Sequence, residues 1–339
     1  MSLVFFSSIL LTLVGIYFIG RNAEVFGLID KTSIRKRHKG KALLVGGISI
    51  YISVLIISLI FVDIDSFSYK VIILCSVVVL TGIIDDINDI SAKLRILIQI
   101  LVSSVIVYLL DIKITSLGKL LSTEELMVGE YSELLTIFAI VAGINAINFI
   151  DGIDGLATSL ALIIFILLLI LKLKFDNHEG VIFLVGVIGS CATFLFYNLS
   201  GFQNQKIFLG DSGSMLIGTL ISVFLIESSQ GTTQVFSPVS ALWFLAIPLI
   251  DSLYVIVRRA TNGVFPFKAD NLHIHYRLLD IGFSTKTILI ILSLTSLILS
   301  IIALFIDIYL GYENLSFMIF MFLIGIYFFF GYLYRPNAN

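Results

Sequence analysis

The chain has 339 residues, of which 58% are hydrophobic and 13% are charged, with a formal net charge of −2 and a mean hydropathy of +1.09. Soluble domains carry about 25% charged and about 45–50% apolar residues, so this composition excludes a soluble globular protein and a disordered one. A spanning helix needs roughly 20 apolar residues, and about 30 residues per helix and loop allow about eleven spans. We therefore expect a single integral-membrane domain over residues 1–339, with buried free thiols at Cys75 and Cys191 rather than a disulfide.

Eleven apolar runs of spanning length follow one another along the chain and predict an all-α polytopic membrane protein. The first run lacks a basic start and a small-residue cleavage site, so we expect a membrane span there and not a signal peptide. The runs lie at about 3–20, 43–62, 69–84, 93–110, 132–150, 156–174, 181–198, 213–227, 237–257, 286–307 and 313–334.

The basic residues gather on one side of this predicted topology. With the N-terminus outside, the cytoplasmic segments hold 16 of the 21 lysines and arginines, and the opposite side holds 5. Cytoplasmic loops carry an excess of Lys and Arg, so the bias favours a periplasmic N-terminus, an odd number of spans and a cytoplasmic C-terminus. The densest basic group, from Arg35 to Lys39, is either a membrane anchor of this kind or part of a site.

Aspartates gather where three of the predicted spans meet the cytoplasmic face. Asp85 and Asp86 end the third span, Asp151 and Asp154 follow the fifth, and Asp211 begins the eighth. One aspartate at a helix end is more often a cap or a solvated boundary residue. A charge at membrane depth, however, costs at least about 2.5 kcal/mol on insertion scales, so several such residues on one face indicate a functional site.

The residues around these aspartates favour phosphate and a divalent cation. Gly152 and Gly155 let the backbone approach a ligand closely, and Asp211-Ser-Gly-Ser opens a helix, whose N-terminal N–H groups favour phosphate. Neighbouring carboxylates repel unless a cation neutralises them, and Mg²⁺ usually binds one or two carboxylates together with substrate phosphates. We therefore predict a Mg²⁺-dependent phosphate-transfer site, with Mn²⁺ as the alternative ion.

Basic and histidine residues supply the other candidates. Lys93 and Arg95 open the fourth span. His273 and His275, in the loop after the ninth span, are either surface imidazoles or site residues. Asp251 lies inside the ninth span, where we expect it to be buried and either paired or near the site.

Four motifs together carry a family resemblance: DDINDIS, NAINFIDGIDGLA, KIFLGDSGS and HIHYRL. Their order and spacing resemble those of the polyprenyl-phosphate N-acetylhexosamine-1-phosphate transferases. The segments LIDKTSIRKRHKGKALLVGG and SPVSALWFLAIPLID resemble the WecA and TagO branch of that superfamily more than the MraY branch with its peptide-bearing substrate. The likeness runs from about residue 20 to about residue 335, nearly the full chain.

The resemblance implies a reaction. UDP-N-acetylglucosamine and undecaprenyl phosphate would give undecaprenyl-diphosphate-N-acetylglucosamine and UMP, with Mg²⁺, in the initiating step of O-antigen, enterobacterial common antigen or related envelope glycan synthesis. The implied location is the bacterial cytoplasmic (inner) membrane, with the active site on the cytoplasmic face. The implied partners are the nucleotide sugar, the lipid phosphate and the bilayer, without nucleic acid, and a homodimer is one option.

The resemblance also implies residue roles. Asp211 matches the aspartate that binds Mg²⁺, and Asp85 and Asp86 match an Asp-Asp motif that acts either as base for the lipid phosphate or as metal ligand and nucleophile. The remaining matches are implied substrate contacts: nucleotide and metal region, Asn148, Asp151 and Asp154; uracil ring, Phe208; phosphates, Lys93 and Arg95; sugar or diphosphate, His273 and His275.

Two residues depart from the family motifs, and one alternative function remains. The family motif commonly reads His-X-His-His, whereas Tyr276 takes the last place here, and Asn271 stands where a basic residue is frequent. Both changes lie in the loop thought to select the sugar, so another UDP-N-acetylhexosamine is the alternative substrate. The rival is a transporter of an anionic substrate, which needs polar groups along a path to both faces, and the outer loops show no such cluster.

Overall fold

The computed structural model describes residues 1–30, 42–203, 205–265 and 272–333, and most of these are helical. Within these ranges, nine helices are long and apolar enough to cross a membrane, and a bent helix pair brings the number to ten. A shorter apolar helix, α2 (Gly46–Phe61), has 16 residues. Each of the eleven apolar runs coincides with a helix or a helix pair, which confirms the expected predominantly helical fold. The chain forms two compact units, residues 1–112 with 137–223 and residues 113–136 with 224–339.

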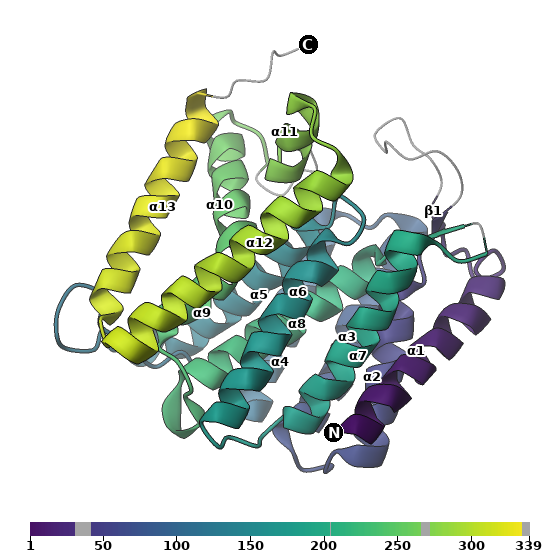
Figure 1. Cartoon of the computed structure of the whole chain (residues 1–339), viewed down its shortest axis with the longest axis horizontal. Coiled ribbons are helices and arrows are strands. Elements are labelled where there is room, and N and C mark those ends of the chain that lie inside the picture. Colours follow the sequence, from purple (N-terminus) through teal and green to yellow (C-terminus); the bar gives the residue numbers. More distant parts are fainter. Residues whose placement is uncertain (31–41, 204, 266–271, 334–339) are drawn as a thin grey trace. The chain divides into compact units, whose positions relative to one another are not determined.

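The first unit is a bundle of long apolar helices (Figure 1). In it α1 packs against both α2 and α7, α6 packs against α7, and α3 packs against α2 and α4. The thiols of Cys75 and Cys191 are buried and free, as expected. Its helices are α1 (Ser2–Arg21), α2, α3 (Phe67–Asn88), α4 (Ala92–Leu110), most of α5 (Ser132–Ile150), α6 (Leu156–Lys174), α7 (Val181–Ser200) and the first turns of α8 (Gly210–Ser229).

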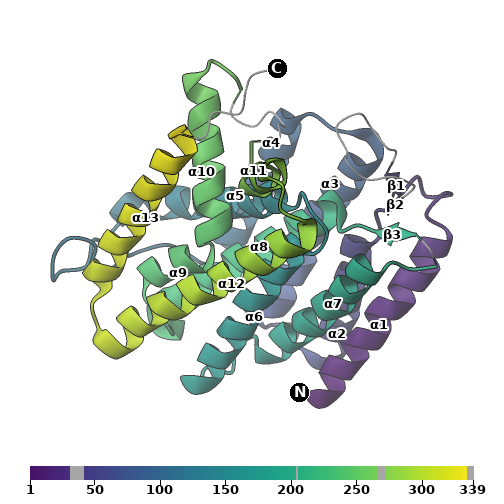
Figure 2. The ribbon, with the colours of Figure 1, turned by 45° about the horizontal axis from the view of Figure 1, so that its top comes forward.

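A small three-stranded sheet joins the loops at one end of this bundle, and Figure 2 shows its strands side by side. Strand β2 (Ala42–Leu43) pairs antiparallel with β1 (Ile29–Asp30) and parallel with β3 (Lys206–Ile207). The pairing continues into the helices, because the backbone N–H groups of Gly46 and Gly47 donate to the carbonyls of Phe208 and Leu209. The start of α8 is thereby fixed against the start of α2.

Glycines let α2 and α3 approach the first turn of α8 closely. A Cβ atom on Gly47 would lie 2.1 Å from the backbone nitrogen of Gly213, and one on Gly82 would lie 2.3 Å from the Cα of Ser212. Small residues at such contacts allow backbone-to-backbone packing between membrane helices. This packing brings the end of α3 and the beginning of α8 to the same place.

In the second unit, the apolar run at 237–257 forms two helices and not one continuous helix. Helices α9 (Pro238–Phe244) and α10 (Ala246–Thr261) are bent by 80° relative to each other at Leu245. Pro248 explains the break, because proline has no N–H to donate to the carbonyl of Phe244 and its ring clashes with that carbonyl. Apolar content alone cannot distinguish this bend from a straight span.

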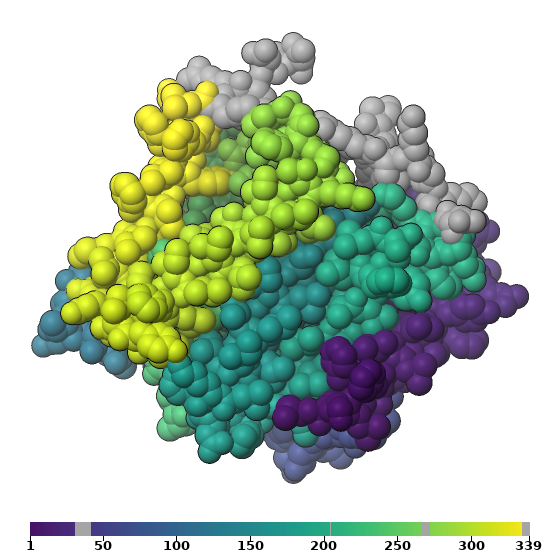
Figure 3. Space-filling view, viewed as in Figure 1, coloured from purple at the N-terminus to yellow at the C-terminus, as the bar shows by residue number. Residues whose placement is uncertain are grey.

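The rest of the second unit packs around the bent pair. Val239 and Trp243 of α9 contact Ala303 and Phe320 in one buried apolar cluster. The surfaces of the last two long helices are visible in yellow-green and yellow in Figure 3. The remaining elements are the short turns Gly129–Tyr131 and Gly231–Thr233, α11 (Ile274–Ile281), α12 (Thr285–Leu304), its π-helical continuation Phe305–Leu310, and α13 (Glu313–Leu333).

Candidate active site

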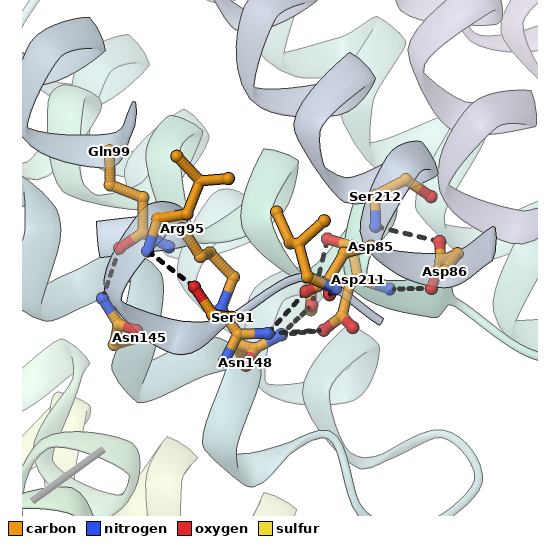
Figure 4. Close-up of polar contacts among 12 residues, drawn as sticks. Asp85, Asp86, Ser91, Arg95, Gln99, Asn145, Asn148, Asp211 and Ser212 are labelled. Atoms are coloured by element: carbon orange, nitrogen blue, oxygen red, sulfur yellow. Dashed lines mark hydrogen bonds and ion pairs between the residues drawn. The ribbon is translucent and has the colours of Figure 1, made fainter. Parts of the chain in front are cut away.

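Three of the four sequence motifs meet in the first unit, at the end of α3, the end of α5 and the start of α8 (Figure 4). Hydrogen bonds join Asp211 to Asp86, 125 residues earlier, and to Asn148, 63 residues earlier. Arg95, in the first turn of α4, lies beside the same group. The aspartates that the sequence distributes over three segments therefore form one cluster.

Asp86 holds the first turn of α8. Its Oδ1 accepts the backbone N–H of Asp211 at 2.7 Å, and its Oδ2 accepts that of Ser212 at 3.2 Å. The first N–H groups of a helix have no partner within the helix, and a carboxylate there is also favoured by the helix dipole. Gly210 permits this approach through a positive φ of 75° and the lack of a side chain, since a Cβ would lie 2.6 Å from Asp86 Oδ2.

Asp85 makes its contacts with α4 and with the loop that joins α3 to α4. Its Oδ2 lies 2.6 Å from Arg95 Nη1, and its Oδ1 accepts the N–H of Ile90 at 2.9 Å. Only 2% of its side chain is exposed, whereas 34% of the Asp211 side chain is exposed. Asp211 therefore offers a far more accessible carboxylate than Asp85.

Neighbouring polar groups fix the orientation of Asp211. Asn148 Nδ2 donates both to Asp211 Oδ1 and, at 2.8 Å, to Ser214 Oγ. Arg95 Nη1 lies 3.9 Å from Asp211 Oδ1, and Arg95 Nε is buried without a hydrogen-bond partner among the described residues. The guanidinium thus has donor capacity left beside the accessible carboxylate.

One further hydrogen bond was missed by the sequence reasoning. Asn145 Nδ2 donates to Gln99 Oε1 at 2.7 Å between α5 and α4, one turn from Asn148 and Arg95 respectively (Figure 4). Polar residues four or three positions apart in apolar helices share a helix face. That spacing was the available signal for Gln99 and Asn145.

The loop between α5 and α6 adds two carboxylates. Burial, together with the negative charges of Asp211, Asp86 and Asp154, raises the pKa of Asp151 to about 8. Asp154 forms an ion pair with Lys206, at the start of β3. The cluster therefore carries negative charge that its own basic residues do not fully offset.

The described residues contain no group of three or more His, Cys, Asp or Glu side chains close enough to enclose a metal ion. A Mg²⁺ ion does not need such a cage, because it usually keeps waters and binds through one or two carboxylates and substrate phosphates. The accessible Asp211 and the proton-retaining Asp151 fit that kind of incomplete donor set. The residues present are thus suited to a cation held jointly with a phosphate ligand.

The other predicted site residues of the first unit lie around the cluster. Phe208 connects β3 to α8 and is partly buried. Lys93 is exposed in the first turn of α4, and side chains two apart on a helix do not face each other, so Lys93 and Arg95 point in different directions. The basic segment 35–39 and Asn271 lie outside the described residues.

The histidine motif belongs to the second unit. His273 and His275 are both buried, which excludes the interpretation as surface imidazoles. Asp251 is buried and paired, as expected, because its Oδ2 lies 2.7 Å from His273 Nδ1. The sequence reasoning missed Arg277 and Tyr327, which also contact Asp251.

Comparison of the sequence with known proteins identifies a family. The model of the family described as "Glycosyl transferase family 4" matches residues 68–229. The chain is 34% identical over 299 residues to the undecaprenyl-phosphate alpha-N-acetylglucosaminyl 1-phosphate transferase of Escherichia coli (strain K12), covering 87% of this chain and 80% of that protein. It is 33% identical over 308 residues to the protein of the same name from Haemophilus influenzae, covering 90% and 86%. With this similarity along most of both chains, the protein belongs to the family of WecA-type transferases described as glycosyl transferase family 4.

Proposed function

We propose that the protein transfers N-acetylglucosamine 1-phosphate from UDP-N-acetylglucosamine to undecaprenyl phosphate and releases UMP. The observation that carries the proposal is the accessible Asp211 carboxylate, fixed at the start of α8 by Asp86 and Asn148 with Arg95 beside it. This combination of anionic, amide and guanidinium groups suits a diphosphate with a divalent cation. The names of the relatives, which specify this lipid phosphate and this sugar, agree with the proposal.

We propose Mg²⁺ as the cation, with Asp211 as the principal ligand. A carboxylate has about four acceptor positions, so Asp86 keeps capacity for the ion beyond its two backbone N–H groups. Asp151 is a further candidate ligand, because its proton would leave when a cation is present. When bound, the ion would neutralise the charge that develops on the diphosphate oxygens.

The side chains of this site then orient the two phosphates. Arg95 has donors for a phosphate oxygen, and its ion pair with Asp85 fixes the direction of the guanidinium. A lipid phosphate is already mostly ionised near neutral pH, so Asp85 and Asp86 contribute more by positioning than by removing a proton. Orientation of this kind can supply a large part of a transfer rate. Phe208, Asp154 and Lys93 are proposed contacts of the nucleotide sugar.

The decisive experiment is UMP release from the purified protein with undecaprenyl phosphate and a panel of UDP-N-acetylhexosamines. We expect release with UDP-N-acetylglucosamine only when the lipid acceptor and a divalent cation are present. Release with a different hexosamine alone would move the assignment to the alternative substrate, which Tyr276 makes worth testing. Uptake of an anion into proteoliposomes without UMP release would replace the proposal with the transporter.

We further propose eleven spans in the cytoplasmic membrane, obtained when α2 and the bent pair α9–α10 each cross it, with the site on the cytoplasmic face. The two ends of α3 offer a test, because Asp65 and Asp89 are exposed just beyond them. We expect Asp89→Cys to react with a membrane-impermeant thiol reagent only from the cytoplasmic side, and Asp65→Cys only from the other side. The native cysteines are buried, so they leave a low background.

A further inference from the structure

A buried carboxylate in the second unit joins three helices, because it lies in α10 and accepts hydrogen bonds from the start of α11 and from α13. Asp251, in α10, is 1% exposed. Its Oδ2 pairs with His273 Nδ1 at 2.7 Å, and its Oδ1 accepts the N–H of Ile274 at 2.9 Å, from the start of α11. The same Oδ1 accepts from Arg277 Nη2 at 3.3 Å and from the hydroxyl of Tyr327, in α13.

The cationic partner of Asp251 is itself held on two sides. The guanidinium carbon of Arg277 lies 4.9 Å from the ring centroids of both Tyr254 and Tyr327, a cation–π arrangement. The hydroxyl of Tyr254 donates to the carbonyl of Gly331 at 2.6 Å, so α10 and α13 are joined at this point. Arg277 therefore cannot leave Asp251 without disturbing two other helices.

The same cluster surrounds a histidine with unsatisfied polar atoms. His275 is fully buried, and neither ring nitrogen has a hydrogen-bond partner among the described residues. Its ring lies parallel to that of His273, with centroids 6.0 Å apart and an angle of 3° between the planes. Leaving a buried polar group without a partner costs free energy, so the segment keeps this conformation only because other contacts impose it.

We propose that Asp251 is the positioning residue of the histidine motif: it fixes the ring of His273 and the first turn of α11, and thereby the placement of His275 for substrate. The proposal rests on the proposed function and on the expectation from the sequence resemblance that this motif contacts the sugar or diphosphate. Ile274 N–H is one of the first donors of α11, where a carboxylate is favoured. An apolar residue could fill the same volume but could not orient an imidazole through Nδ1, which accounts for a buried charge at this position.

The test replaces the carboxylate with an amide of the same shape. In Asp251→Asn, the amide oxygen can still accept from Ile274, and the amide Nδ2 then faces His273 Nδ1 as a donor. The His273 ring must then carry its proton on Nε2, so nitrogen NMR of labelled histidine in the detergent-solubilised protein should report the opposite tautomer. We expect kcat/KM for UDP-N-acetylglucosamine to fall about 10- to 100-fold, the effect of losing a charged hydrogen-bond acceptor.

Two further variants make the result specific. Asp307→Asn is the matched control, because Asp307 in the same unit also accepts two hydrogen bonds, from Ser237 N and Ser240 Oγ, and pairs with none of the histidines that the structure describes. We expect Asp307→Asn to keep the His273 tautomer and to retain kcat/KM within about threefold, since neutral-donor bonds away from the substrate affect stability more than rate. Tyr327→Phe removes one of the four donors and should give a loss between those of the other two variants.

The outcomes separate the positioning role from the proposed function. An unchanged tautomer and unchanged kinetics in Asp251→Asn would overturn the positioning role, as would equal losses in Asp251→Asn and Asp307→Asn. If Asp251→Asn does not fold, Tyr327→Phe carries the test: a loss of kcat/KM no larger than that of Asp307→Asn would then overturn the positioning role. If the unmodified protein releases UMP from none of the UDP-sugars tested, the proposed function fails. The NMR comparison still decides whether Asp251 orients His273.

Discussion

The carboxylate of Asp86 accepts the backbone N–H of Asp211 at 2.7 Å, across 125 residues of sequence. The end of one membrane helix thus serves as the N-terminal cap of another, and the capped helix begins with the accessible aspartate of the site. Asp86 controls where Asp211 points because the N–H groups of Asp211 and Ser212, the second and third residues of α8, use both oxygens of Asp86. The two residues of the Asp-Asp motif therefore have different partners: Asp86 contacts the start of α8, and Asp85 contacts Arg95.

Asp86→Ala tests the cap. Loss of a capping carboxylate costs about 1 kcal/mol of stability, so the thermal midpoint in detergent should fall by a few degrees. UMP release should fall much further, because the first turn of α8 is no longer held. Asp89→Asn is the control: Asp89 ends the same helix with a φ of 54°, which asparagine tolerates, and it should keep both midpoint and activity. Equal effects of the two substitutions would contradict the capping role.

Asp211→Asn tests the accessible carboxylate. The substitution removes one negative charge and keeps the size of the side chain, and the backbone bond to Asp86 is unaffected. We expect UMP release to fall by about 10²- to 10³-fold or more, since preorganised charge is usually the largest contribution to such a transfer. Size-exclusion chromatography should show the same monodisperse peak as the unmodified protein. Full activity in Asp211→Asn would exclude it as the cation ligand.

Arg95 and Asp85 form a pair that a double-mutant cycle can separate into stability and activity. Arg95→Ala leaves the buried Asp85 unpaired, and removing one partner of a buried ion pair costs about 3–5 kcal/mol. Asp85→Ala combined with Arg95→Ala should recover most of that stability, because no uncompensated charge remains. UMP release should stay low in the double variant, since the phosphate donor is still missing. Recovery of activity along with stability would show that Arg95 acts only through the fold.

The pH dependence of stability tests the negative charge around Asp151. Its pKa is raised from 3.8 to about 8, so its contribution to stability is complete below about pH 4 and is lost as the pH rises toward 8. Without divalent cation, the thermal midpoint should therefore fall between pH 5 and 8 more steeply in the unmodified protein than in Asp151→Asn. Added Mg²⁺ should reduce this difference at the upper pH, and a chelator should restore it. Parallel pH profiles in the two proteins would show that the charge of Asp151 does not affect stability, contrary to its proposed place among the other aspartates.

The sequence was sufficient to predict the helices because the signal for them is local. Each run of apolar residues forms a helix on its own account, and the coincidence of all eleven runs with helices follows from that. Successive spans run in opposite directions, so the order of the helices also predicted that the three aspartate motifs lie at one end of the bundle. The break at Leu245 was missed, although Pro248 gave a local signal for it.

The contacts of the individual aspartates were decided only by the tertiary structure. In a membrane, lipid surrounds the bundle with a medium as apolar as its core, so apolar periodicity does not reveal which helix faces meet. The contacts of Asp86 with Asp211 and of Asp251 with Tyr327 depend on close packing that glycines such as Gly82 and Gly331 permit. Sequence therefore determined which residues are available at the site, while helix packing determined which carboxylate stays accessible and which ones hold the structure in place.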